Sequence, residues 1–186
     1  MSRSDEQLFD DFLAGNEDSF ALLVRRNLQP VYAFVRRMVG DAAAAEDIAQ
    51  EAFFRAWKHR GKYKKSKAPV RTWLFGIARN AAIDWLRARR ERVFSDFEEG
   101  DDTSFADTIP DLEALPEELF ARVEAKEMLD RGLQSLPPAQ REVVVLHMQS
   151  DLTLEEVARA LARPVNTVKS QYRRALKSLR SFFEKK

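Results

Sequence analysis

The stretch that decides the fold is residues 153–179, TLEEVARALARPVNTVKSQYRRALKSL. Its first four residues form a capping box, a threonine followed three positions later by a glutamate, which predicts the start of a helix. Residues 162–164, Ala-Arg-Pro, predict a short turn, because proline suits the first position of the helix that follows. Beyond the turn, apolar residues recur at three- and four-residue steps, as on one face of an amphipathic helix. The pattern indicates a helix-turn-helix.

The outer face of the second helix carries short polar side chains near its start and long cations farther along. In a recognition helix, short polar groups approach base edges, whereas arginine and lysine reach phosphates or guanine. An ordinary amphipathic surface helix is the alternative, but this face has almost no acidic residues. We therefore expect DNA to be read by Asn166, Thr167, Lys169, Ser170, Arg173, Arg174 and Lys177.

Charge is distributed unevenly along the 186 residues, although the net charge is only +1. Residues 55–92 carry 13 basic and two acidic side chains, whereas residues 94–118 carry ten acidic side chains and no basic one. The basic character returns in residues 163–186. Two basic blocks separated by an acidic block predict two contacts with a polyanion.

Several classes of protein are excluded by composition. The chain has no cysteine, so disulfides and thiolate metal sites are excluded. No apolar run is long enough to span a bilayer, and the N-terminus has no apolar signal core. We expect a cytoplasmic protein without membrane insertion.

Hydrophobic periodicity is helical wherever it is regular, and no strand-like alternation appears. The acidic residues 94–116 have no sustained period and predict a linker, extended or disordered when free. We expect an all-α fold of two small helical domains, 1–93 and 117–186, joined by this flexible acidic linker. Helices are predicted over about residues 4–15, 17–39, 41–59, 70–92, 117–136 and 137–148, ahead of the helix-turn-helix.

The basic segment begins with a lysine-rich loop around Tyr63 and continues into the helix predicted over 70–92. Aromatic rings offer stacking platforms to unstacked bases, while neighbouring cations follow the phosphates. Trp73 falls on the polar side of that helix together with Gly76 and Asn80, which leaves room for a close approach. Trp85 falls on the apolar side and is expected in the core. The pattern favours nucleic-acid binding.

The helix predicted over 41–59 contains AEDIAQEAFFRAW at residues 45–57. Acidic residues and an exposed-looking Phe54 share one side of it, which fits either a solvated face or a protein-docking surface. Spacing alone does not separate the two. Its apolar positions include Ile48, Ala52, Phe53, Ala56 and Trp57.

No motif for covalent chemistry appears. The chain has no phosphate-binding glycine loop, Ser/His/Asp set or metal-ligand cluster, and His59 and His147 are isolated. We expect no enzymatic activity and no cofactor. A free-standing operator-binding regulator is an alternative, and it would bind duplex DNA tightly by itself, usually as a dimer on a palindrome. An RNA-modifying enzyme is a further alternative, but it lacks any catalytic constellation.

The order of these motifs resembles bacterial sigma factors, the promoter-recognition subunits of RNA polymerase, and specifically the short extracytoplasmic-function (ECF) group. AEDIAQEAFFRAW resembles the polymerase-docking helix of that family. TWLFGIARNAAIDWLRARR, at 72–90, resembles the segment that opens and reads the −10 element. Residues 136–180 resemble the domain that reads the −35 element. The resemblance covers nearly the whole chain.

The resemblance implies core RNA polymerase and promoter DNA as partners, with duplex contacts at −35 and single-stranded contacts at −10. An anti-sigma factor is an expected third partner. It further implies that the C-terminal domain docks on the polymerase flap through apolar side chains around residues 143–146, and that the acidic linker mimics RNA in its channel. The implied docking residues on the polymerase clamp helices are Glu46, Asp47, Gln50, Glu51 and Phe54. The implied −10 residues are Lys62, Tyr63, Lys64, Lys65, Ser66, Lys67, Arg71, Trp73, Arg79, Asn80, Asp84 and Arg87.

The family often has a glycine in the turn, which here reads Ala162-Arg163-Pro164, and another where this chain has Asn166. Because asparagine tolerates unusual backbone angles, we expect the turn to persist. The implied function is that of a dissociable initiation subunit, whose −35 and −10 readers are spaced by the polymerase. The free protein is therefore expected to bind promoters poorly.

Overall fold

The structure, a computed structural model, describes residues 3–96, 117–149 and 152–184. Within these ranges the regular structure is helical, which confirms the all-α prediction. No described helix is both long and apolar enough to cross a membrane. The helices are α1 (Asp5–Leu13), α2 (Glu17–Val39), α3 (Ala42–Lys58), α4 (Val70–Asp96), α5 (Glu117–Gln134), α6 (Pro138–Gln149), α7 (Leu154–Ala160) and α8 (Val165–Glu184), with a 3-10 turn, η1 (Arg60–Lys62).

The helix starts follow the capping residues of the sequence. Both predicted capping boxes form, at Ser4 before α1 and at Thr153 before α7. Asn16 and Asp41 accept hydrogen bonds from the first turns of α2 and α3. Gly40 ends α2 with a left-handed φ of 79°, a conformation that glycine adopts without strain.

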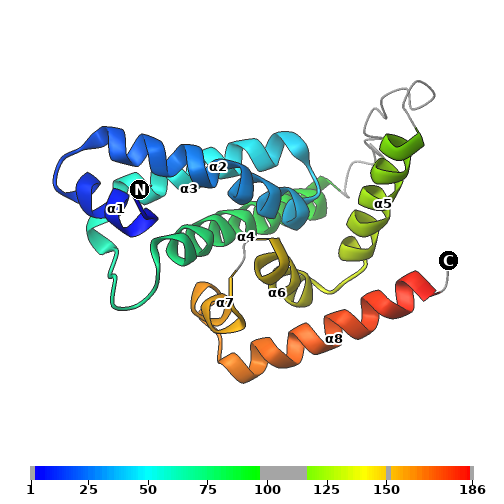
Figure 1. Cartoon of the computed structure of the whole chain (residues 1–186). Coiled ribbons are helices and arrows are strands. Elements are labelled where there is room, and N and C mark those ends of the chain that lie inside the picture. The colour runs from blue at the N-terminus through cyan, green and yellow to red at the C-terminus, as the bar shows by residue number, and fades with distance from the viewer. Residues whose placement is uncertain (1–2, 97–116, 150–151, 185–186) are drawn as a thin grey trace.

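The N-terminal half is a bundle of α1 to α4 (Figure 1). The helices α2, α3 and α4 contact one another along their lengths, and α1 packs across α2 and α4. The core includes Phe34 of α2 and Phe75 of α4, both fully buried, whose rings meet edge to face at 5.6 Å. Phe75 is therefore a packing residue and not a base-stacking platform.

The C-terminal half contains α5 to α8, and α7, the turn and α8 form the predicted helix-turn-helix. Helices α6, α7 and α8 pack against one another. Leu146 of α6, Val157 of α7 and Val168 of α8 have no exposed surface and belong to the core of this half. In Figure 1, α8 lies along the outer edge of the molecule, with α6 and α7 between it and α4.

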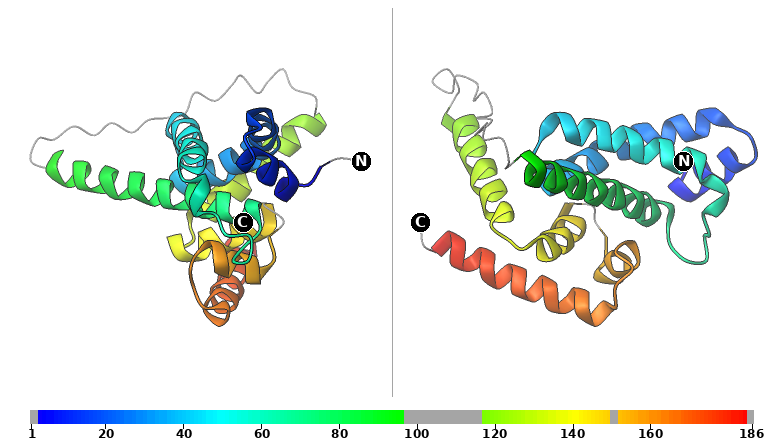
Figure 2. Two further views of the ribbon diagram at one scale, coloured as in Figure 1. Left: turned by 90° about the vertical axis from the view of Figure 1, so that its left-hand side faces the viewer. Right: turned by 180° about the vertical axis from the view of Figure 1, so that it is seen from behind.

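The two halves pack against each other. Helix α6 contacts α2, and α7 contacts α4. Both views in Figure 2 show α6, α7 and α8 on one side of α4 and α2 and α3 on the other. At the contact, a Cβ on Gly76 would lie 3.3 Å from the carbonyl oxygen of Ala160. The space expected beside Gly76 is occupied by the backbone of α7.

Several boundaries differ from the sequence prediction. Helix α4 continues to Asp96, so residues 94–96 of the expected linker are helical, and 97–116 lie outside the described residues. Helix α8 extends five residues past 179 to Glu184. In the turn, the left-handed residue is Ala162, with φ of 50°, whereas Asn166 lies inside α8. The turn persists, as expected, but the residue that takes the unusual backbone angle is Ala162 and not the asparagine.

Candidate nucleic-acid interface

The basic loop, residues 62–69, folds back onto α1. The ring of Tyr63 meets that of Phe9 edge to face at 4.9 Å between centroids. Its hydroxyl donates a 3.0 Å hydrogen bond to the carbonyl oxygen of Ala68, which ties the two ends of the loop together. Burial, reinforced by two nearby carboxylates, raises the pKa of this hydroxyl.

Most polar side chains of the loop point to solvent. Lys65 is the one held by a carboxylate, with its Nζ 2.9 Å from an oxygen of Asp10 in α1. Both partners are more than half exposed, so this ion pair is easily exchanged for a phosphate. The exposed predicted −10 residues of the loop are Lys62, Lys64, Lys65, Ser66 and Lys67.

Trp73 does not lie free on the polar side of α4, as the helical periodicity predicts. Its ring is partly buried, 5.4 Å from the centroid of Phe9 and 5.3 Å from that of Tyr63. The prediction failed because the loop and α1, which are distant in sequence, cover that side of the helix. Trp85 is partly buried and packs against the core, as expected.

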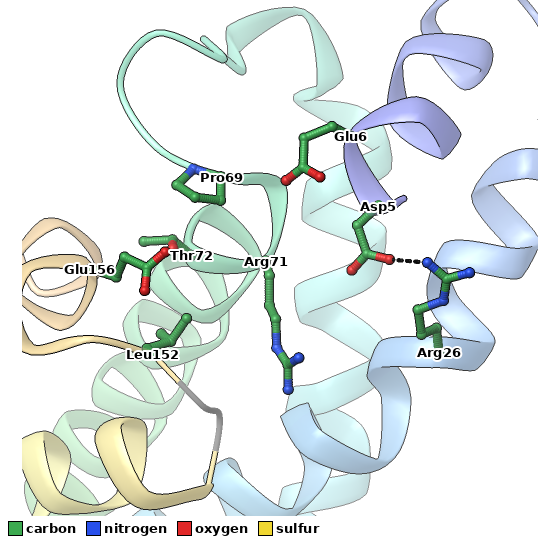
Figure 3. A pocket seen from close by; sticks show the side chains of 8 residues that line it. All are labelled: Asp5, Glu6, Arg26, Pro69, Arg71, Thr72, Leu152 and Glu156. Carbon is green, nitrogen blue, oxygen red and sulfur yellow. Dashed lines mark hydrogen bonds and ion pairs between the residues drawn. The ribbon is translucent and has the colours of Figure 1, made fainter. Parts of the chain in front are cut away.

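A cavity of about 350 Å³ opens where the start of α4 meets α1, α2 and α7. Figure 3 shows its three carboxylates and two arginines, of which Arg26 pairs with Asp5 at 2.6 Å. The other, Arg71, has a buried Nε without a hydrogen-bond partner. The cavity lies between the two halves and is lined by Asp5, Glu6, Arg26, Pro69, Arg71, Thr72, Leu152 and Glu156.

The polar side of α4 presents the remaining predicted −10 residues. Asn80, Asp84 and Arg87 are exposed, whereas Arg79 is partly buried. Asp84 receives a 3.2 Å hydrogen bond from Arg55 of α3. Asn80, Asp84 and Arg87 thus share one exposed side of α4, whereas Arg79 points to the contact with the C-terminal half.

Glu142 of α6 is the polar centre of the contact between the halves. Its carboxylate is almost completely buried, 2.9 Å from Arg163 of the helix-turn-helix and 3.5 Å from Arg79 of α4. A buried carboxylate is stable only when positive groups compensate it. Arg79 thus has two candidate partners, DNA and Glu142, and it meets the second in this arrangement.

Further polar contacts join the end of α2 to α5 and α6. Arg37 pairs with Asp130 at 3.0 Å, and Gln134 donates to the carbonyl of Arg37 at 3.0 Å. Arg141 lies 3.5 Å from the carbonyl oxygen of Met38, and burial lowers its pKa. Sequence periodicity gave no sign of this interface, because its members come from positions about 90 to 100 residues apart.

The predicted docking face of α3 is open. Phe54 is 54% exposed and stacks on Trp57, which is 41% exposed, so Trp57 differs from the other apolar positions named on this helix, which are buried. Beside this face runs a groove of about 290 Å³ lined by Leu28, Gln29, Tyr32, Glu46, Ala49 and Gln50. The predicted docking residues exposed on α3 are Glu46, Asp47, Gln50, Glu51 and Phe54.

The outer face of α8 is also open. Its predicted DNA contacts Asn166, Thr167, Lys169, Arg173, Arg174 and Lys177 are exposed, and Ser170 is partly exposed. Lys169 pairs with Glu155 of α7 at 2.8 Å, and this lysine lowers the pKa of the Glu155 carboxyl group. The inner face of the helix holds the core residues Val168, Ala175 and Leu179.

The apolar segment 143–146, expected to meet the polymerase flap, is instead the core of the C-terminal half. Its four side chains are at most 3% exposed. Among the described side chains of this half, the exposed large apolar ones are Leu129, Met148, Leu176 and Phe183. The family resemblance suggested an exposed apolar docking site here, whereas a continuous apolar run is typical of a helix that is buried on all sides.

The two halves match two known families separately. Residues 23–92 match Sigma-70 region 2, and residues 126–179 match Sigma-70, region 4. The chain is 32% identical over 169 residues to the ECF RNA polymerase sigma factor SigW of Bacillus subtilis, covering 89% of each chain. It is 32% identical over 178 residues to the RNA polymerase sigma-H factor of Pseudomonas aeruginosa, covering 94% of this chain and 91% of that one.

Two solved structures share the fold. One is CnrH in complex with the cytosolic domain of CnrY, with a TM-score of 0.72, 23% identity and 97% coverage of both chains. The other is RpoE of Bartonella quintana with the anti-sigma factor NepR, with a TM-score of 0.69, 23% identity, and coverage of 89% of this chain and 96% of that one. These matches do not favour an operator-binding regulator. The chain belongs to the extracytoplasmic-function sigma factors, the dissociable initiation subunits that direct core RNA polymerase to promoters.

Proposed function

We propose that this sigma factor reads its promoters through two surfaces on separate halves of the chain. Residues 1–93 dock on the polymerase and read the −10 element, residues 117–186 read the −35 element, and residues 94–116 link them. The observation that carries this division is the open outer face of α8, where seven adjacent polar or basic side chains have no role in the core. A second polar and basic surface, on the loop 62–69 and α4, lies in the other half.

At the −35 element, α8 enters the major groove. Thr167 and Ser170, near the helix start, approach base edges, and the longer Arg173 and Arg174 reach guanine or phosphate. Lys169 exchanges its exposed pair with Glu155 for DNA, which costs little because both groups remain solvated. Asn166 and Lys177 extend the contact at the two ends of the face.

At the −10 element, the loop 62–69 and the polar side of α4 hold the non-template strand. Unpaired bases are captured by the loop, and Arg71, Arg79 and Arg87 follow the phosphates. Opening of the duplex then follows from the capture of bases that have left the stack. Asn80 and Asp84 contribute hydrogen-bonding groups along the same path.

Promoter reading requires the two halves to separate. The −35 and −10 elements are centred about 25 base pairs apart, roughly 85 Å of duplex at 3.4 Å per base pair. The longest helix, the 27-residue α4, spans only about 40 Å, and α7 packs directly on it. A molecule packed in this way cannot contact both elements, so binding to polymerase must replace the contact between the halves.

The exposed face of α3 is the proposed docking site on the polymerase. Asp47 and Glu51 supply negative charge, and Phe54 and the adjoining groove supply apolar surface. A protein interface commonly combines an aromatic anchor with a polar rim. The Asp47→Asn substitution should therefore weaken holoenzyme assembly, whereas Asp18→Asn, at an exposed position on α2, should not.

We further propose that the protein acts in the cytoplasm, performs no covalent chemistry and is controlled by an anti-sigma factor. The relative RpoE was solved with such a factor, NepR. Pull-down from the native host tests this, and recovery of core polymerase without any inhibitory protein would count against it.

Run-off transcription with core polymerase on a library of promoters tests the proposal as a whole. We expect transcripts from a subset that shares −35 and −10 elements, and weak duplex binding by the free protein. The Thr167→Ala and Lys64→Ala variants should shift the preferred −35 and −10 sequences, respectively. Tight, specific duplex binding by the protein alone, with no transcript from any promoter, would overturn it.

A further inference from the structure

Helix α1 holds the basic loop through a cluster of three aromatic rings. The centroids of Phe9, Tyr63 and Trp73 lie 4.9, 5.4 and 5.3 Å apart in pairs, and both contacts of Phe9 are edge to face. Phe9 is fully buried, whereas the other two rings are partly exposed. Phe9 therefore lies beneath the loop, where it supports both the loop ring and the first turn of α4.

The helix that carries Phe9 is itself fixed to the bundle. Its N-terminus is closed by a capping box, and Asp5 accepts hydrogen bonds from Arg26 at 2.6 Å and from the buried Asn27 at 2.9 Å. At its C-terminal end, the ring of Phe12 stacks on that of Phe20 of α2, with the ring centroids 4.6 Å apart. A helix anchored at both ends is a rigid support for a loop that contacts it.

A second tether links the same two segments. Adjacent to Phe9, Asp10 pairs with Lys65 at the middle of the loop. The loop is thus held by an apolar contact near its start and by a charged contact at its centre. The matched Sigma-70 region 2 begins at residue 23, so α1 lies outside the matched residues.

We propose that α1 is the positioning element for −10 base capture, and that Phe9 is its central residue. This inference rests on the proposed role of the loop 62–69. Phe9 is buried and does not touch DNA. It acts by holding Tyr63, and hence the exposed lysines and Ser66, in the arrangement that accepts an unstacked base. The loop is then already ordered when the protein has folded, so binding of a base does not carry the entropic cost of ordering it.

The experiment measures holoenzyme binding to a single-stranded non-template oligonucleotide that covers the −10 element. Each base is replaced in turn by an abasic site, and the ratio of the two affinities is recorded. With the wild-type protein, a captured base should be preferred by about 5- to 150-fold, the range that the stacking of one base supplies. The Phe9→Ala variant should reduce this ratio to within about twofold of unity, because the loop no longer has a fixed shape.

The matched control is Leu23→Ala, which removes a fully buried side chain from α2 and destabilises the same bundle. It should keep the wild-type ratio. Should Phe9→Ala fail to fold, Phe9→Leu preserves much of the volume without the ring and should lower the ratio part of the way. Hydrogen exchange provides a readout other than binding. The backbone amides of residues 62–68 should exchange faster in Phe9→Ala than in the wild type, and at the wild-type rate in Leu23→Ala.

The two proposals fail in different ways. A wild-type holoenzyme that shows no preference for a base over an abasic site at any position would overturn the role of the loop itself. A wild-type preference that Phe9→Ala retains, with loop exchange unchanged, would overturn the role of α1. An equal loss of the ratio in Phe9→Ala and Leu23→Ala would reduce Phe9 to a stability residue and also overturn the inference.

Discussion

The recognition helix α8 and the basic loop 62–69 are the two proposed nucleic-acid surfaces, and they are built in different ways. The reading face of α8 belongs to one helix, and its side chains already project into solvent. The loop has no regular structure of its own beyond its first residue, and its shape depends on Phe9, Asp10 and Trp73. Local sequence is therefore enough to form the −35 surface, whereas the −10 surface needs contacts between segments far apart in the chain.

The two surfaces also differ in accessibility. Helix α8 lies at the outer edge of the molecule, whereas the polar side of α4 meets the C-terminal half at Arg79 and Gly76. A protein in this arrangement can present its −35 surface while part of its −10 surface is covered. The comparison indicates that polymerase binding matters more for the −10 surface than for the −35 surface.

The largest effect is expected on the recognition helix. Replacing Arg174 with alanine should cost about 1–3 kcal/mol of −35 discrimination if the side chain reads a base, or weaken all promoters evenly if it meets phosphate. Holoenzyme binding to promoters substituted at each −35 position measures this. Arg180→Ala, at an exposed position farther along the same helix, is the control, and a loss as large there would contradict the assigned face.

The next effect concerns the contact that covers α4. Glu142→Gln keeps the side-chain volume but removes the charge shared by Arg79 and Arg163. Closure should weaken by about 1–2 kcal/mol, less than for a fully buried pair, because both arginines keep some solvent contact. Energy transfer between labels on α3 and α8 reports the change, and the absence of cysteine allows specific labelling at introduced cysteines.

The control for closure is Glu155→Gln, which removes a carboxylate that pairs within the C-terminal half alone. Transfer efficiency should fall in Glu142→Gln and stay at the wild-type value in Glu155→Gln. Equal efficiency in all three proteins would show that Glu142 does not hold the halves together.

A smaller effect is expected inside the loop. Tyr63→Phe removes the hydrogen bond to Ala68 and should lower the free energy of unfolding by about 1 kcal/mol. Because the folded protein raises the pKa of this hydroxyl, its protonated form is favoured by folding. The stabilisation is therefore complete below the unfolded pKa of about 10 and is lost as the pH rises through the folded value.

Denaturant unfolding between neutral pH and pH 11 measures the contribution of the Tyr63 hydroxyl to the free energy of unfolding. The stability difference between wild type and Tyr63→Phe should shrink above about pH 10. Tyr32→Phe removes a hydroxyl elsewhere in the same half and serves as the comparison. A difference between wild type and Tyr63→Phe that stays constant with pH would contradict the assigned burial of the hydroxyl.

The smallest effect is expected in the turn before α8. Ala162 has a left-handed backbone, which costs a non-glycine residue about 1–2 kcal/mol. Ala162→Gly removes this strain but increases the conformational entropy of the unfolded chain. The free energy of unfolding is therefore expected to rise by about 0.5–1 kcal/mol. Ala43→Gly, at an exposed position in α3, should instead lower the free energy of unfolding by about that amount. Thermal unfolding of the two variants measures these changes. A lower stability of Ala162→Gly would show that the backbone at Ala162 is not strained.

The sequence by itself determined the helices, their caps and the face of α8. These depend on contacts within a few residues, as at Ser4, Asp41 and Thr153, where one side chain satisfies the next turn. The exposure of Phe54 and the reading face of α8 could be read from periodicity for the same reason.

Only the tertiary structure decided what covers each helix. Periodicity assigns a residue to a side of its helix but does not say which distant segment packs there, so it left Trp73 on an open side that α1 and the loop in fact cover. The family resemblance likewise did not reveal that the segment 143–146 is buried. The same limit hid the support of the loop by Phe9 and the contact of Arg79 with Glu142. These contacts join positions more than 50 residues apart, and packing between helices, which no local pattern encodes, decides them.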